Sequence, residues 1–238
     1  PGVPPIEGWQ FTWDNCCRNA AITNILNPSS AGFTLRASMY PFVDPSTGIP
    51  TPADPCFDSS PEFKEQPKTI LCTGFPFSYS HNAFDEELDE LVYSWGEPLD
   101  DFLSTYNPPV DPPILTFNAP YTISSPLPGN PTLDPTTGEV SYNANISGNF
   151  VTCIKVSSYK CGQLVAEIYR EIQVILISCP PMAGAGANNK PVVNPPFNGG
   201  TSYSTSVFAG DFVTTEDTLK NALIKFEKFK KIKYDICV

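Results

Sequence analysis

The clearest alternation of hydrophobic and polar positions lies in residues 149–157 and 164–178. In each segment one parity is mainly apolar and the other is mainly polar, which is typical of a strand with one buried face. Only a short polar stretch separates the two segments, so we expect an antiparallel hairpin. The positions expected on the core face are Phe150, Thr152, Ile154, Val156, Ala166, Ile168, Arg170, Ile172, Val174 and Leu176.

Shorter segments carry the same pattern along the rest of the chain. It predicts strands over residues 33–40, 69–80, 91–95, 115–123 and 139–142. Gly74 and Pro76 predict an interruption inside the second of these, as in an edge strand or a bulge. Proline-rich residues 41–62 and 97–113 predict loops, and the D-P-T-T-G sequence at 134–138 predicts a turn.

Strands joined by turns, with no convincing helix between them, predict an all-β antiparallel sandwich. We expect a β segment over 1–58 that forms part of a sandwich module, and a sandwich over 59–181. The small residues 182–189 predict a linker. Residues 190–213 loosely echo 60–80, which indicates the start of a further module within 190–238. Its basic tail, 215–238, has helical spacing and predicts a short C-terminal helix.

Composition narrows the class of protein further. The 238 residues include 27 Pro and 15 Gly, and only 16% are charged, which excludes a coiled coil, a collagen-like repeat and a helical bundle. A net charge of −11 argues against nucleic acid or anionic lipid as the main partner. No apolar run is long enough for a membrane span. His81 is the only histidine, which argues against a catalytic site built on histidine, and we expect a non-enzyme.

Eight cysteines without a C-x-x-C spacing predict disulfides and an extracellular, oxidising location. Cys153 and Cys161 flank the turn of the predicted hairpin, so we expect them to pair. The alternative is that several of the cysteines are buried free thiols. The candidates are Cys16, Cys17, Cys56, Cys72, Cys153, Cys161, Cys179 and Cys237.

Several segments together resemble one protein family. The most specific is W-D-N-C-C-R-N-A-A-I at 13–22, followed by an S-S-P-E-F entry at 59–63, an acidic stretch with an L-x-Y strand, and the turn at 134–138. A closing R-x-x-Q-x-x-x-x-x-C is formed by Arg170, Gln173 and Cys179. Over roughly residues 9–180 the chain resembles the very large gliding-motility adhesins of Bacteroidota, which the type IX secretion system exports.

The resemblance implies cadherin-like or Ig-like modules in tandem on a cell-surface protein. It implies adhesion or filament structure without catalysis, in gliding motility or surface attachment. The implied partners are other copies or modules of the same protein, surface glycans and the type IX secretion machinery. The basic tail on an acidic body could dock to the next copy. The alternative function is a carbohydrate-binding module of a larger secreted enzyme, and a hydrolase domain is a third, weaker interpretation.

The resemblance also points to a calcium site. Related modules often carry D-x-D-G-D, whose carboxylates wrap a hard cation. Asp85, Glu87 and Asp89 keep that spacing, but Leu88 stands where the glycine would fall. Calcium is the one cofactor considered, and a solvated acidic turn is the alternative.

Aromatic residues make up 12% of the chain, and they motivate the carbohydrate-binding alternative. Trp9 and Trp95, with Trp13, could form a platform on which sugar rings stack. The alternative is ordinary packing, since tryptophan in a sandwich usually lies in the core. No nucleophile, phosphate-loop or zinc-protease motif is present, and no catalytic residue is predicted.

Overall fold

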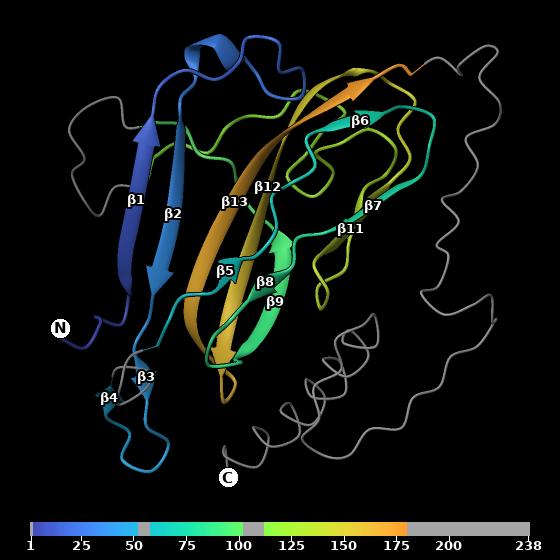
Figure 1. Cartoon of the computed structure of the whole chain (residues 1–238). Coiled ribbons are helices and arrows are strands. Elements are labelled where there is room, and N and C mark those ends of the chain that lie inside the picture. Colours follow the sequence, from blue (N-terminus) through green and yellow to red (C-terminus); the bar gives the residue numbers. More distant parts are fainter. Residues whose placement is uncertain (1, 52–57, 102–111, 180–238) are drawn as a thin grey trace, which may run out of the picture. The chain divides into compact units, whose positions relative to one another are not determined.

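The computed structural model describes residues 2–51, 58–101 and 112–179 (Figure 1). The chain divides into two units, Pro1–Cys179 and Pro180–Val238, and every described residue belongs to the first. The expected linker at 182–189, the further module over 190–238 and its C-terminal helix therefore lie outside the described residues.

The described part is strand-rich, and its sheets are almost wholly antiparallel. Its largest sheet has the strand order β1-β2-β13-β12-β9, with β6 also pairing with β13 in parallel. The strands are β1 (Trp9–Asn15), β2 (Phe33–Met39), β6 (Ile70–Cys72), β9 (Glu90–Trp95), β12 (Gly148–Lys160) and β13 (Gln163–Ile177). The N-terminal segment thus adds its two strands to the same sheet as the later part of the chain.

A second, three-stranded sheet has the order β10-β11-β7, and two small strand pairs accompany it. Its strands are β7 (Phe77–Ser80), β10 (Thr132–Leu133) and β11 (Glu139–Tyr142). The small pairs are β3 (Phe42–Val43) with β4 (Pro50–Thr51), and β5 (Glu62–Phe63) with β8 (Ala83–Phe84). The one helical element in the described ranges is a three-residue 3-10 turn, η1 (Pro28–Ser30).

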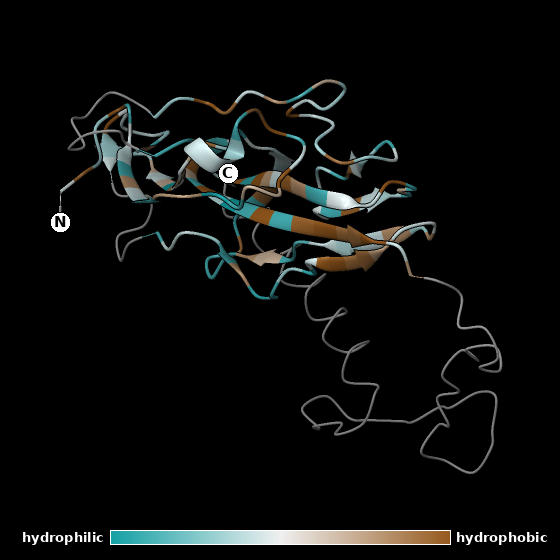
Figure 2. Ribbon diagram, turned by 90° about the horizontal axis from the view of Figure 1, so that it is seen from above, coloured by the Kyte–Doolittle hydropathy of each residue, from teal (hydrophilic) through white to brown (hydrophobic). Residues whose placement is uncertain are grey.

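The predicted hairpin is confirmed. β12 and β13 pair antiparallel from Gly148↔Leu176 to Lys160↔Gln163, so the alternating apolar residues of both strands share a face. That face meets Val140 and Tyr142 of β11 in one buried cluster between the two sheets. Figure 2 shows hydrophobic (brown) and hydrophilic (teal) bands alternating along the long strands of the sheet.

Other expectations hold in part. The segment 69–80 is two strands, β6 and β7, separated at Gly74 and Pro76 as predicted. Two predictions were wrong. Residues 115–123 form no strand, because their hydrogen bonds go to turns and to isolated bridges such as Ile25↔Phe117. The 41–62 segment, expected to be loop throughout, contains β3 and β4 and the start of β5.

The predicted turn at 134–138 closes through its aspartate. The Asp134 carboxylate accepts backbone hydrogen bonds from Thr136 and Thr137, both at 2.8 Å, and Gly138 adopts a φ of +66°. That conformation favours glycine. Residues 44–48 read D-P-S-T-G and close in the same way around Asp44, a second copy of the motif that the sequence analysis did not single out.

A buried asparagine docks the segment between β1 and β2 on the sheet. Asn24 is fully buried, and its side chain exchanges two hydrogen bonds with the backbone of Val151 and donates a third to Pro126 O. An amide that satisfies both of its polar atoms in this way can be buried at little cost. Across the described ranges, no helix has the length and apolar character needed to cross a bilayer.

Candidate functional site

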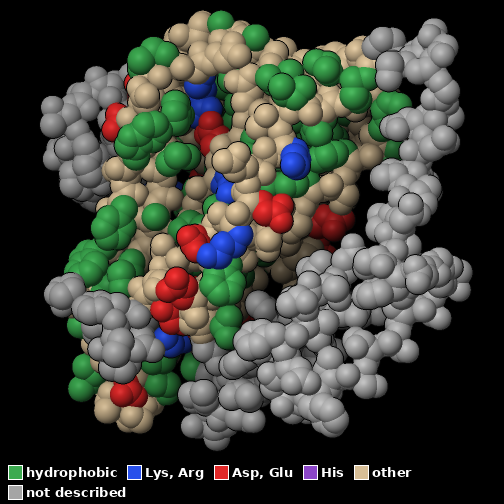
Figure 3. All heavy atoms as spheres, viewed as in Figure 1, with side chains coloured by type: hydrophobic (Ala, Val, Ile, Leu, Met, Phe, Trp, Pro, Cys, Tyr) green, Lys and Arg blue, Asp and Glu red, His purple; other side chains and the backbone are tan. Residues whose placement is uncertain are grey.

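An exposed apolar surface lies over β1 and β2. Phe11 and Trp13 of β1 are 59% and 55% exposed, although both point to the face that carries the core further along the sheet. With Leu35 and Ala37 of β2 and Phe63 of β5 they line a shallow groove of about 360 Å³, which we call the aromatic groove. Figure 3 shows hydrophobic side chains gathered over β1 and β2, on the left of the view.

The aromatic groove exists because the second sheet is narrower than the first. The buried cluster joins β11 to β9, β12 and β13, whereas no residue of β1 belongs to it. Ile168 of β13 is nearly buried, and the same face becomes progressively more exposed toward Trp13 at the sheet edge. Trp13 packs edge-to-face on Phe33, with 5.3 Å between ring centroids. Its indole ring is therefore held in place while staying open to solvent.

A buried ion pair anchors the chain just after β1. Arg18 forms a bidentate pair with Glu171 of β13, with Nη2 to Oε2 at 2.9 Å. It also donates to the backbone oxygens of Gly32 and Leu99. Burial raises the pKa of Glu171, and the guanidinium beside it works in the opposite direction. Arg18 lies inside the 13–22 motif, although its role in this ion pair was not predicted from the sequence.

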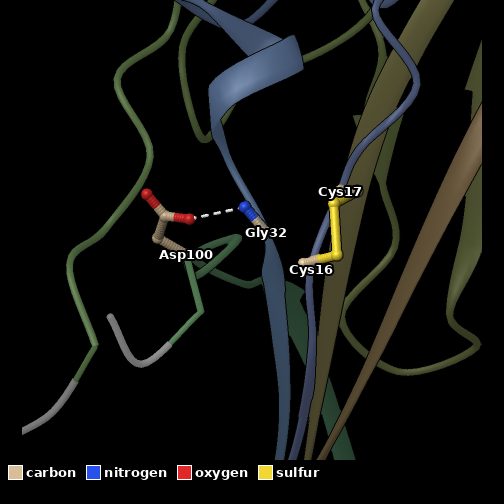
Figure 4. Close-up of a disulfide and its surroundings, with 4 residues drawn as sticks. All are labelled: Cys16, Cys17, Gly32 and Asp100. Carbon is tan, nitrogen blue, oxygen red and sulfur yellow. Dashed lines mark hydrogen bonds between the residues drawn. A yellow bond between two sulfur atoms is a disulfide. The ribbon is translucent and has the colours of Figure 1, made fainter. Parts of the chain in front are cut away.

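Between β1 and Arg18 the chain carries a vicinal disulfide. Cys16 and Cys17 are adjacent in sequence, exposed and bonded to each other, with Cα atoms 3.7 Å apart. Figure 4 shows this ring beside the start of β2, where Gly32 N–H donates to Asp100 Oδ1 at 2.7 Å. Cys17 has a φ of +80°, so the chain turns sharply out of β1 at this point.

The remaining described cysteines correct the sequence prediction. Cys153 is a free, buried thiol whose pKa is raised by burial, so the expected Cys153–Cys161 bond is wrong. The hairpin turn begins only after Lys160, and eight residues of extended strand span about 26 Å, far beyond disulfide reach. Cys161 is disulfide-bonded elsewhere.

Cys72 bonds to Cys179. The reason is the parallel pairing of β6 with the end of β13, which places Cys72 beside Ile177, two residues from Cys179. Cys56 and Cys237 lie outside the described residues.

The three predicted calcium ligands have separate roles in the structure. Asp85 is buried, and it accepts hydrogen bonds from Asp89 N at 3.0 Å and Ser158 Oγ at 3.2 Å. Glu87 instead accepts from the backbone and hydroxyl of Ser59. In the described ranges, no group of three or more His, Cys, Asp or Glu side chains is arranged to hold a metal ion. Asp85 therefore closes a buried turn and is not a solvated carboxylate.

A third aspartate joins Asp85 and Asp89 from a distant part of the sequence. The Asp58 side chain is 1% exposed, and its nearest cation is Lys160 Nζ at 3.7 Å. Burial raises the pKa of Asp58 to about 7, and the negative charge of Asp89 adds to the shift. We call Asp58, Asp85 and Asp89 the carboxylate cluster.

His81 lies in the interior beside Arg170. It is 3% exposed, and its imidazole contacts Tyr79 edge-to-face at 5.2 Å between centroids. Burial lowers the pKa of His81 to about 4, and the positive charge of Arg170 adds to this effect. Arg170 itself stacks on Phe63, with its guanidinium carbon 3.7 Å from the ring centroid. Arg170 is one of the positions expected on the core face, and this cation–π contact explains how its charge is accommodated there.

The aromatic residues predicted to contact ligand are not the exposed ones. Trp95 packs against the core cluster, and Trp9 is half-buried at the start of β1. Trp13, which the sequence analysis named only in passing, and Phe11, which it did not name, form the open surface instead. Comparison of the chain with family models, with curated proteins and with solved structures finds no match.

Proposed function

We propose that this chain is a non-catalytic module of an extracellular adhesin or filament protein, built from Ig-like or cadherin-like sandwiches in tandem. The observation that carries the proposal is the aromatic groove beside the sheet edge formed by β1. A soluble protein gains nothing in stability from holding Phe11 and Trp13 in water, and exposed apolar patches of this kind mark interaction surfaces. Disulfides at Cys16–Cys17 and Cys72–Cys179 suit an oxidising exterior.

The test measures first whether the protein is exposed on the cell surface and then whether it mediates adhesion. Intact source cells are treated with a protease and with an antibody to this chain, and we expect both to reach the protein. Beads coated with the purified full chain should then adhere to the same cells. Trp13→Ser should reduce adhesion severalfold, whereas Phe75→Ser, at a residue that is 61% exposed and distant in sequence from the groove, should not. A protein that is inaccessible on intact cells would contradict the proposal.

A second candidate function is carbohydrate binding, and the exposure of the same two rings favours it. Sugar rings stack on flat aromatic side chains, and Glu62 at the groove offers a hydrogen-bond acceptor. Polysaccharide pull-down with the wild-type chain and with Trp13→Ser decides this candidate. Retention of the wild type alone would support it.

A further inference from the structure

We propose that β1 is a homophilic docking edge, at which two copies of this chain join their six-stranded sheets through antiparallel β1–β1 pairing. The partner is a second copy, and the inference deepens the proposed adhesive function by naming what the module adheres to. It rests on two features of the described structure: an unprotected edge and a self-complementary sequence.

The two edges of the large sheet differ. At the far edge, the turn at 134–138 covers β9, since Tyr93 N–H donates to Pro135 O at 2.8 Å and Gly138 lies against the Tyr93 ring. At the near edge, β1 pairs with β2 on one side, and none of its residues makes a backbone hydrogen bond on the other side to any described residue. Soluble proteins usually protect edge strands with lysine, proline or a bulge. β1 has none of these over its seven residues, and its pairing with β2 is regular.

The sequence of β1 matches itself in the reverse direction. If two copies pair antiparallel about Thr12, then Phe11 of each copy lies opposite Trp13 of the other. Gln10 then lies opposite Asp14, which gives an amide donor to each carboxylate and places no like charges together. Opposite residues share a face in an antiparallel pair, so both aromatic pairs fall on the open side of the sheet. One dimer contains two such Phe–Trp pairs, and aromatic cross-strand pairs stabilise a sheet.

The joined sheets would also align the two aromatic grooves. The continuous apolar surface would then run across the dimer axis from one copy to the other. The contact is small compared with a standard interface, so we expect weak self-association, with a Kd on the order of 0.1 mM. On a surface that displays many copies, high local concentration makes such contacts effective. This is how a weak edge could serve adhesion between cells or assembly of a filament.

The experiment is sedimentation equilibrium of the full chain at concentrations up to about 1 mM. Added salt is used because each copy carries a net charge of −11, and screening reduces the repulsion. We expect the wild type to dimerise. Phe11→Lys and Trp13→Glu, tested separately, should each weaken the dimer about tenfold or more, because each removes both aromatic pairs. Phe75→Lys changes an equally exposed ring elsewhere and should leave the dimer unchanged.

Mixing the two single variants tests the register itself. In a heterodimer of the Phe11→Lys and Trp13→Glu chains, the new lysine faces the new glutamate and the remaining Phe11 faces the remaining Trp13. The equimolar mixture should therefore dimerise within about threefold of the wild type, although neither variant does so alone. Circular dichroism of each variant checks that it is folded.

Failure of this inference is separable from failure of the proposed function. A wild type that stays monomeric over the whole range, or a mixture that fails to associate, would overturn homophilic docking. Trp13-dependent binding of polysaccharide by a monomer would overturn it as well, in favour of a sugar in the groove. Surface accessibility on intact cells is measured independently and does not depend on dimerisation.

Discussion

Replacing His81 tests whether burial controls the acid stability of this fold. His81 is 3% exposed, and its Nδ1 is buried without a hydrogen-bond partner in the described structure. Its pKa falls from 6.5 to about 4 through burial, with a further contribution from Arg170. The folded chain therefore binds this proton less readily than the unfolded chain. The stability that neutral His81 contributes is present above pH 6.5 and is lost as the pH falls through about 4.

The size of the effect follows from the shift. A pKa difference of about 2.5 units corresponds to about 3 kcal/mol of unfolding free energy at the acid end of this window. His81→Phe removes the titrating group and keeps a ring beside Tyr79 and Phe63. Between pH 7.5 and pH 3.5, we expect the unfolding free energy of the variant to fall by about 3 kcal/mol less than that of the wild type.

The assay is urea denaturation at the two pH values, monitored by tryptophan fluorescence. Asn82→Gly is the matched control, because it changes the next residue without adding or removing a titrating group and suits the positive φ of that position. It should shift stability equally at both pH values. If His81→Phe shows the same acid loss as the wild type, the reasoning from burial is refuted.

Three further predictions concern the carboxylate cluster, the buried ion pair and the long-range disulfide. Asp58→Asn should raise the unfolding free energy by about 4 kcal/mol at pH 7.5 and leave it nearly unchanged at pH 3.5, because a pKa raised from 3.8 to about 7 lowers stability as the pH rises through that window. Urea denaturation at both pH values measures this difference. Arg18→Ala should lower the unfolding free energy by about 3–5 kcal/mol, because it leaves the Glu171 carboxylate buried without its cation. Thermal unfolding monitored by circular dichroism measures the loss, and Glu171→Gln is measured for comparison. The double change Cys72→Ser and Cys179→Ser should lower the unfolding free energy by about 4 kcal/mol, as expected for a cross-link that spans 107 residues. A reducing agent added to the wild type should cause at least the same loss, because it also opens the disulfides of Cys16–Cys17 and Cys161.

Local pattern predicted the hairpin of β12 and β13 because a long alternation has only one way to place its apolar parity in a core. The turn at 134–138 was predicted for a similar reason, since aspartate, proline and glycine each have a fixed function within five residues. Both features depend on neighbours in sequence. Such features can be predicted without knowledge of the rest of the fold.

The features that the sequence did not predict depend on contacts between distant segments. Cys72 finds Cys179 because β6 pairs in parallel with the end of β13, which no local spacing indicates. The predicted Cys153–Cys161 bond assumed that β12 would end much earlier than Lys160. In the carboxylate cluster, spacing selected Glu87, but the turn directs Glu87 to Ser59 and a distant aspartate takes its place.

The candidate surface shows a different limit. The alternation of Trp9, Phe11 and Trp13 with polar residues is visible in the sequence, and it indicates which residues share a face. It does not indicate whether a second layer covers that face, because coverage depends on the width of the opposing sheet. In this fold the three-stranded sheet packs on β12 and β13 and leaves β1 open. A pattern that predicts a core residue therefore yields a surface residue at the edge.

The geometry around β1 also explains why an open edge can persist here as a specific docking surface. Arg18 ties the chain after β1 to Glu171. The Cys16–Cys17 disulfide restricts the two residues that lie between the end of β1 and Arg18. The strand is thus fixed at its C-terminal end and paired with β2 along its whole length. A rigid edge loses little conformational entropy on pairing, so even a small contact can be productive. By the same argument, loosening this anchor should weaken β1–β1 association even when Phe11 and Trp13 are unchanged. The double change Cys16→Ser and Cys17→Ser isolates that effect, because it leaves the Cys72–Cys179 bond and the disulfide of Cys161 in place.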